Sequence, residues 1–339
     1  MRPVTRIFFW LNPGQEPFAR AIAAAAGAEI VAAGSPDRGK SGAVAAELGV
    51  LATDDLRTAL ISADCHAVIL LAPGEFGSDS GGADVRALLQ ARARGVRVAC
   101  LEAAPSSAID LLSCGWDSLD EPLEPDDLIV PISLAWKPPQ QLTDLLKEFG
   151  TARALQLSTG GPAQRGTLIS RLLFAFALVS EFIAEVESVD ASFIDSVGNP
   201  SLHLLPQEKL TELHGSFNCL LRFSGSRSAT LLVSDQQQAS FFDLTMIGTQ
   251  GSLTLSCTLD AIDCLWIHAD NSREETQIKV DSMPFELSLV LEALDPKIET
   301  TVSMEAMLTF AQTALLSART GEAESTSTIS RILESARGG

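Results

Sequence analysis

The sequence predicts a two-domain α/β protein, with a doubly wound parallel sheet first and then an α+β domain that has an open, mainly antiparallel sheet. In residues 6–100, continuous apolar runs alternate with alanine-rich helical stretches. This alternation is typical of parallel strands that are buried on both faces. Beyond residue 128 it gives way to one long apolar helix and a series of short strand-like runs separated by turn residues.

The strand-like runs of the first half are short and apolar, and helical stretches separate them. We expect the strands at 6–11, 29–34, 66–72 and 96–101, and the helices at 17–27, 41–49 and 83–95. Short links between strand and helix favour right-handed crossovers and a parallel sheet. Acids and prolines crowd residues 117–127, a poor place for a helix or a strand. We therefore predict two domains, 1–127 and 128–339.

The second domain is expected to begin with a long helix over residues 167–187. The strand-like runs that follow are 216–223, 229–235, 241–248, 252–257, 263–270 and 276–280. Two later helices, at 284–294 and 304–320, should cover one face of the resulting sheet. The other face would then be free for a ligand or a second subunit.

Charge and composition exclude several classes of function. The chain of 339 residues has 24 Lys and Arg against 43 Asp and Glu, a formal net charge of −19, which disfavours nucleic acids and anionic membranes. Its most apolar stretch, 172–179, is shorter than the roughly 20 residues that cross a bilayer. The six cysteines form no CxxC pair, which favours a reducing, cytoplasmic location. The four histidines lack metal-ligand spacing, so no metal site is predicted.

The order of these elements, together with three local strings, resembles the glucose-fructose oxidoreductase and inositol dehydrogenase family (Gfo/Idh/MocA). The strings are "AEIVAAGSPDRGKSGAVAAELGV" (28–50), "MIGTQGSLTL" (246–255) and "ALLSARTGE" (314–322). The resemblance covers nearly the whole chain. It implies an N-terminal Rossmann domain that binds NAD or NADP, and a C-terminal domain whose open sheet supports a sugar-like substrate and contacts between subunits of a homo-oligomer.

The opening stretch "RIFFWLNPGQEPFA" (6–19) has the strand–turn–helix order of a dinucleotide site but lacks its glycines. In the family the turn reads G-x-G-x-x-G, which lets the backbone approach a pyrophosphate. The three glycine positions hold Trp10, Asn12 and Gln15. Gly14 remains, but Pro13 and Pro17 remove N–H donors from the start of the helix. The stretch is therefore either an unusual nucleotide site, with Asn12 and Gly14 as its contacts, or a structural remnant of one.

Other cofactor positions of the family are also altered. The acid that would bind a ribose 2′-hydroxyl aligns with Ser35, and Ser35 with Arg38 nearby is compatible with the 2′-phosphate of NADP. A solvated turn is the alternative. The family's strand-ending Thr-Pro corresponds here to Ala72 and Pro73. Glu102 follows the next strand, where it would face a ligand or solvent. These residues leave three possibilities open: the protein binds NADP, it binds NAD, or it binds no cofactor.

The catalytic positions of the family have lost their acid–base groups. Its Glu-Lys-Pro matches "VACLEAAPSS" (98–107), which contains no lysine, and its Asp-x-x-x-His aligns with Ser170 and Phe174. We therefore assign no catalytic residue. His203 and His214 lie where the family pocket is expected, and either is a substitute base or a surface residue.

Three functions remain after these observations. The first is an oxidoreductase-fold protein without dehydrogenase catalysis, a pseudoenzyme that acts as a binding or assembly component. The second is an NADP-dependent sugar or cyclitol dehydrogenase in which Glu102 or a histidine replaces the lost residues. The third is a regulatory protein that responds to a metabolite.

Overall fold

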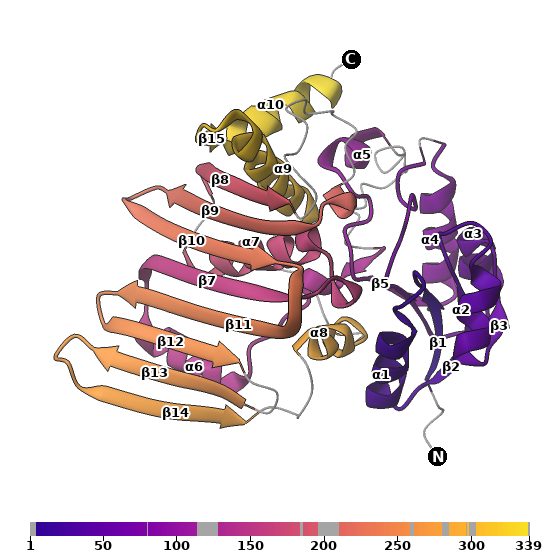
Figure 1. Cartoon of the computed structure of the whole chain (residues 1–339), viewed down its shortest axis with the longest axis horizontal. Helices are drawn as coiled ribbons and strands as arrows, with labels where there is room; N and C mark the ends of the chain where they lie inside the picture. Colours follow the sequence, from indigo (N-terminus) through magenta and orange to yellow (C-terminus); the bar gives the residue numbers. More distant parts are fainter. Residues whose placement is uncertain are drawn as a thin grey trace.

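The computed structural model describes residues 5–79, 81–113, 128–183, 186–195, 210–257, 261–279, 285–295, 297 and 303–337. They form two sheets side by side, a six-stranded one and a nine-stranded one (Figure 1). The fold class predicted from the sequence is confirmed. The predicted domain boundary lies in residues outside the described ranges, and it stays a prediction.

The first sheet is parallel and has the strand order β3-β2-β1-β4-β5-β6. Its strands are β1 (Arg6–Trp10), β2 (Glu29–Gly34), β3 (Leu51–Ala52), β4 (Ala67–Leu70), β5 (Arg97–Cys100) and β6 (Val130–Pro131). Its helices are α1 (Glu16–Ala26), α2 (Ser41–Leu48), α3 (Leu56–Ser62), α4 (Ala83–Ala93) and α5 (Ala108–Ser113). This is the order of a Rossmann sheet, in which the topology reverses beside β1. Strand β6 comes from beyond residue 128, so the sheet extends a little further along the chain than the domain prediction.

The second sheet is mostly antiparallel, with the order β14-β13-β12-β11-β7-β10-β9-β8-β15. Its strands are β7 (Ala152–Pro162), β8 (Ser188–Asp195), β9 (Gly215–Phe223), β10 (Arg227–Ser234), β11 (Gln236–Gly248), β12 (Gly251–Cys257), β13 (Ala261–His268), β14 (Arg273–Lys279) and β15 (Glu324–Ser325). Its helices are α6 (Gln140–Phe149), α7 (Leu168–Phe182), α8 (Phe285–Ala293), α9 (Met304–Thr320) and α10 (Thr326–Arg337). Only β7 and β10 pair in parallel.

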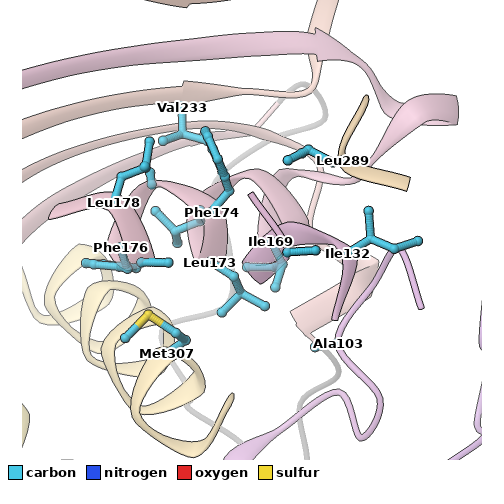
Figure 2. Packing of buried hydrophobic residues seen from close by; sticks show 14 of the residues in the cluster. Ala103, Ile132, Ile169, Leu173, Phe174, Phe176, Leu178, Val233, Leu289 and Met307 are labelled. Carbon is cyan, nitrogen blue, oxygen red and sulfur yellow. The ribbon is translucent and has the colours of Figure 1, made fainter. Parts of the chain in front are cut away.

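Helix α7 fills the centre of the second domain. Every residue from Leu168 to Val179 is buried, because the helix lies between the sheet, which contributes Val233, and α9, which contributes Met307 (Figure 2). Thr167 caps its first turn by accepting a hydrogen bond from Ser170 N at 3.5 Å. The helix ends at Phe182, earlier than the sequence predicted.

The helices of the second domain lie on one face of its sheet, as the sequence predicted. In Figure 1 the sheet stands in front of α6, α7 and α9, and α7, α8 and α9 contact its strands. The sequence did not predict two further helices of this domain. Helix α6 brings Phe149 against Trp266 of β13, with ring centres 5.9 Å apart. Helix α10 packs on α9 and α5 and buries Ile329 and Leu333.

At the end of β1, Trp10 packs across the backbone of β2. A Cβ atom on Gly34 would lie 2.3 Å from the indole ring of Trp10 and 2.3 Å from the carbonyl oxygen of Thr53. The absence of a side chain at Gly34 therefore lets the indole turn inward, where it also stacks on Phe8 with centroids 6.4 Å apart. The bulky residue in the family's glycine position is thus accommodated by a glycine on the neighbouring strand.

Gly34→Ala should destabilise the protein by about 1–3 kcal/mol or more, because the new methyl group has no space beside Trp10 and Thr53. The measurement is the free energy of unfolding in urea. Gly42→Ala, in helix α2 with open space around it, is the matched control and should stabilise by about 0.5–1 kcal/mol. Equal effects of the two substitutions would contradict the packing at Gly34.

Candidate functional site

A cavity with a volume of about 850 Å³ lies at the carboxyl ends of the strands of the first sheet. Strand ends of the first domain contribute Asn12, Pro36, Ala72, Pro73 and Glu102. The second domain contributes Gln164, Thr167, Thr211 and His214. This is the crevice in which doubly wound sheets bind their ligands.

Four of the predicted site residues line this cavity, namely Asn12, Ala72, Pro73 and Glu102, whereas Gly14, Ser35 and Arg38 are absent from its described lining. Ser35 is buried, and its hydroxyl accepts a hydrogen bond from Asp37 N at 3.2 Å. Arg38 is exposed. The structure therefore does not bring Ser35 and Arg38 together as a phosphate pocket on the cavity wall.

The turn between β1 and α1 is filled by its own side chains. Asn12 N donates to Gln15 Oε1 at 2.8 Å, and Gly14 N donates to the Glu16 carboxylate at 2.7 Å. Both acceptor side chains are buried. A carboxylate at a helix N-terminus is stabilised by the helix dipole, as a phosphate would be. The Glu16 carboxylate therefore accepts the backbone hydrogen bond that a phosphate group would accept in a dinucleotide site.

Gln15 also ties the turn to the rest of the molecule. Its Nε2 donates to the carbonyl oxygens of Leu71, at 3.3 Å, and Gln164, at 3.2 Å. Leu71 follows β4 and Gln164 lies before α7, so one amide side chain joins the first sheet to the second domain. The sequence showed that a glycine is lost at this position, but it did not reveal this bridge.

A dinucleotide pyrophosphate does not fit this turn in the usual pose. Its backbone donors at Asn12 and Gly14 are already bonded, and Pro13 and Pro17 supply none. The charged lining of the cavity is mainly acidic: Asp37, Asp54, Asp55, Glu75, Asp84 and Glu102. Among the described lining residues, Arg57 is the one lysine or arginine, and its Nε donates a hydrogen bond to Asp84 Oδ1 at 2.6 Å. The occupied backbone N–H groups and the negative electrostatic potential of the cavity both disfavour binding of a polyanion.

The positions of the family's acid and base on α7 have structural roles here. Ser170 donates its hydroxyl hydrogen to the Leu101 carbonyl oxygen at 2.7 Å. Phe174 is in an aromatic cluster with Phe285, Phe242 and Trp136, at centroid distances of 5.1, 5.8 and 6.2 Å. Both side chains are buried, and Figure 2 shows Phe174 among the other apolar side chains of the core. Neither is placed to accept a proton from a ligand in the large cavity.

A buried ion pair between Arg171 and Glu286 lies beside these two residues. Arg171 Nη1 lies 3.1 Å from Glu286 Oε1, and a second arginine nitrogen donates to Pro162 O at 3.2 Å. The cavity next to the pair measures only about 20 Å³, which is room for about one water molecule. No sugar-sized ligand fits in this small cavity.

Glu102 is the carboxylate that joins β5 to the start of α7. It accepts hydrogen bonds from Thr167 N at 2.9 Å and from the Thr167 hydroxyl. Burial raises the pKa of Glu102 to about 7, against the lowering effect of those two hydrogen bonds and of the Arg171 charge. A substantial fraction of the molecules therefore keep Glu102 protonated up to neutral pH.

His214 stands on the cavity wall with a carboxylate behind it. Its Nδ1 lies 2.8 Å from Asp235 Oδ2, and Asp235 Oδ1 accepts a hydrogen bond from Gly215 N at 2.9 Å. Sequence reasoning named His214 but missed Asp235. The available signal was an acid directly after a strand-like run, "ATLLVSD", which antiparallel pairing brings back beside the start of the preceding strand. His203 lies outside the described residues.

The described residues meet neither the requirements of a metal site nor those of a membrane-spanning helix. No group of three or more His, Cys, Asp or Glu side chains is arranged to hold a metal ion there. Its helices include none with the length and apolarity needed to span a bilayer. The described cysteines are free thiols.

The pKa of Glu102 predicts how its contribution to stability varies with pH. An unfolded glutamate ionises near pH 4.5, whereas Glu102 in the folded protein ionises near 7. The contribution of protonated Glu102 to the free energy of unfolding is therefore fully present below pH 4.5 and is lost as the pH rises to about 7. Relative to Glu102→Gln, the wild-type free energy of unfolding should fall by about 3 kcal/mol over this range. A pH-independent difference in urea unfolding would show that the carboxyl has an ordinary pKa.

Comparison by sequence matches no family model and no curated protein. Solved structures match over nearly the whole chain. A levoglucosan dehydrogenase in complex with NADH and L-sorbose is 12% identical with a TM-score of 0.65, over 95% of this chain and 99% of the other. Apo scyllo-inositol dehydrogenase from Lactobacillus casei is 16% identical with a TM-score of 0.61, over 96% and 98% of the two chains.

A third similar structure is the UDP-N-acetylglucosamine 3-dehydrogenase from Acidithiobacillus ferrooxidans, 14% identical with a TM-score of 0.60 over 93% of this chain and 98% of that one. The three have different substrates, so what they share with this chain is an architecture. The resemblance predicted from the sequence is confirmed at this level. The chain has the fold of the glucose-fructose oxidoreductase and inositol dehydrogenase family.

Proposed function

We propose that this protein binds a small, polar, sugar-like ligand in the 850 Å³ cavity and does so without a dinucleotide. The observation that carries the proposal is the turn after β1, where Gln15 and Glu16 take the backbone donors that a pyrophosphate needs. The volume supports it, since small-molecule pockets measure roughly 300–1,000 Å³. L-sorbose in the levoglucosan dehydrogenase complex shows that this architecture accommodates a sugar in another protein.

The wild-type protein should give no binding heat with NADH or NADPH in calorimetry, and Trp10 fluorescence should not change. Replacing both filling side chains (Gln15→Ala with Glu16→Ala) frees the N–H groups of Asn12 and Gly14, so inorganic pyrophosphate should bind this variant more tightly than wild type. Glu47→Ala, which removes an exposed carboxylate of the same domain, is the control and should not bind pyrophosphate. Micromolar NADPH binding by the wild type, weakened by Arg38→Ala, would sink the proposal.

That outcome would favour the second candidate, an NADP- or NAD-dependent sugar or cyclitol dehydrogenase. Two observations support it: similar structures include complexes with NADH, and His214 stands on the cavity wall as a replacement base. The third candidate, a metabolite-responsive regulator, would show itself as a change in oligomer size when a ligand binds.

We further propose that two copies of the chain associate through the open face of the nine-stranded sheet. Across this face, one row of paired residues carries no charge over six strands: Leu220, Thr230, Gln156, Thr245, Thr254 and Leu265. Exposed aliphatic side chains lie on the same face, among them Leu232 at 47% and Ile247 at 54% exposure. An uncharged row with aliphatic side chains beside it offers a chain of net charge −19 a place to meet a second copy with less repulsion than elsewhere on its surface.

Wild-type protein should therefore sediment as a dimer, and Leu232→Lys should shift it to monomer, because two buried ammonium groups would meet near the interface centre. Ile332→Lys is the matched control: Ile332 is 44% exposed but belongs to α10. It should leave the dimer intact. A wild-type monomer at all concentrations in analytical ultracentrifugation would contradict the proposed interface.

A further inference from the structure

A histidine–aspartate pair with the geometry of a general base lies on the wall of the large cavity. Asp235 is buried, and both its oxygens are engaged, by His214 Nδ1 and by Gly215 N. The His214 side chain is 53% exposed. With Nδ1–H donated to the carboxylate, Nε2 carries the free lone pair. The buried carboxylate therefore fixes both the orientation of the ring and the nitrogen that can accept a proton.

A second proton-bearing group, Glu102, lines the same cavity from the first domain. It is held in place by Thr167, through the backbone N–H and the hydroxyl. The negative charge of Asp235 contributes to raising the pKa of Glu102 to about 7, behind the larger effect of burial. The two carboxylates therefore lie within electrostatic reach of each other. One wall of the cavity can accept a proton while the other holds one to donate.

We propose that His214, oriented by Asp235, and Glu102 form a cofactor-free acid–base site for a polyhydroxyl ligand that carries a carbonyl group. This inference rests on the proposed function, because the ligand must occupy the cavity in place of a dinucleotide. The two groups would interconvert keto-sugar isomers. That reaction class needs one base and one acid, and it consumes neither oxidant nor reductant.

The chemical step balances with the groups that are present. His214 Nε2 takes a proton from the carbon next to the carbonyl, and the electrons of that C–H bond form a carbon–carbon double bond. The carbonyl π electrons move to oxygen, which takes the proton of Glu102 and completes a neutral enediol. Protonated His214 returns its proton to one of the two carbons of the double bond, the hydroxyl on the other carbon gives its proton back to Glu102, and the product is the starting sugar or its isomer.

The step predicts exchange of carbon-bound hydrogen with solvent. The full-length protein would be incubated in D₂O with D-fructose, L-sorbose or 2-keto-myo-inositol. NMR would then follow the loss of the signal from the proton on the carbon next to the carbonyl. His214→Gln and Glu102→Gln should each slow exchange about 100-fold or more. Asp235→Asn should slow it because the amide favours the wrong tautomer. His268→Gln, a histidine of β13 that lines a different part of the molecule, is the control and should retain the wild-type rate.

Saturation-transfer NMR on the same samples reports binding separately from exchange. Exchange that His214→Gln abolishes while the variant still binds the ketose would support the acid–base site. Binding by wild type without exchange, or exchange that survives His214→Gln, would overturn the acid–base site and leave the proposed ligand site standing. If none of the three ketoses binds, the inference fails, and the NADPH titration then decides the proposed function by itself.

Discussion

Burial of helix α7 on every side is the constraint on which the rest of the structure depends. A helix with apolar residues on all of its faces is stable in a soluble protein only when other layers enclose it, and here the sheet, α9 and the segment after β6 enclose α7. The start of this helix meets the first domain, where Glu102 accepts hydrogen bonds from Thr167 and Ser170 donates to Leu101. The packing of the second domain thus sets the position of the cavity wall in the first.

The same helix fills the positions at which the family resemblance expects an acid and a base. The ring of Phe174 and the buried ion pair of Arg171 with Glu286 occupy this part of the interior, and the cavity beside the pair measures only about 20 Å³. Breaking such a pair by removing one partner typically costs about 3–5 kcal/mol, so opening a pocket at this place would require several simultaneous changes. The proposed ligand site lies elsewhere, at the strand ends of the first sheet.

The sequence predicted the fold well because its strands and helices differ in period and in apolar content. It missed β7, whose outer face carries Ala154, Gln156 and Ser158 and whose end is rich in glycine, because a central strand with few large apolar residues on one face resembles a loop in sequence. It found the altered turn from Trp10 and Pro13, since lost glycines and N–H groups can be counted. It could not find the filling of that turn by Gln15 and Glu16, because side-chain direction depends on tertiary contacts. Asp235 was missed for the same reason.

Gln15 has a consequence for how the cavity meets its ligand. In a protein whose two domains are held together by a bound cofactor, the width of the cleft changes as the cofactor comes and goes. Here the Gln15 amide joins Leu71 to Gln164 through the protein's own hydrogen bonds, so this link between the two sides of the cleft needs no bound cofactor. A link of this kind, formed before association, lowers the entropic cost of binding a ligand.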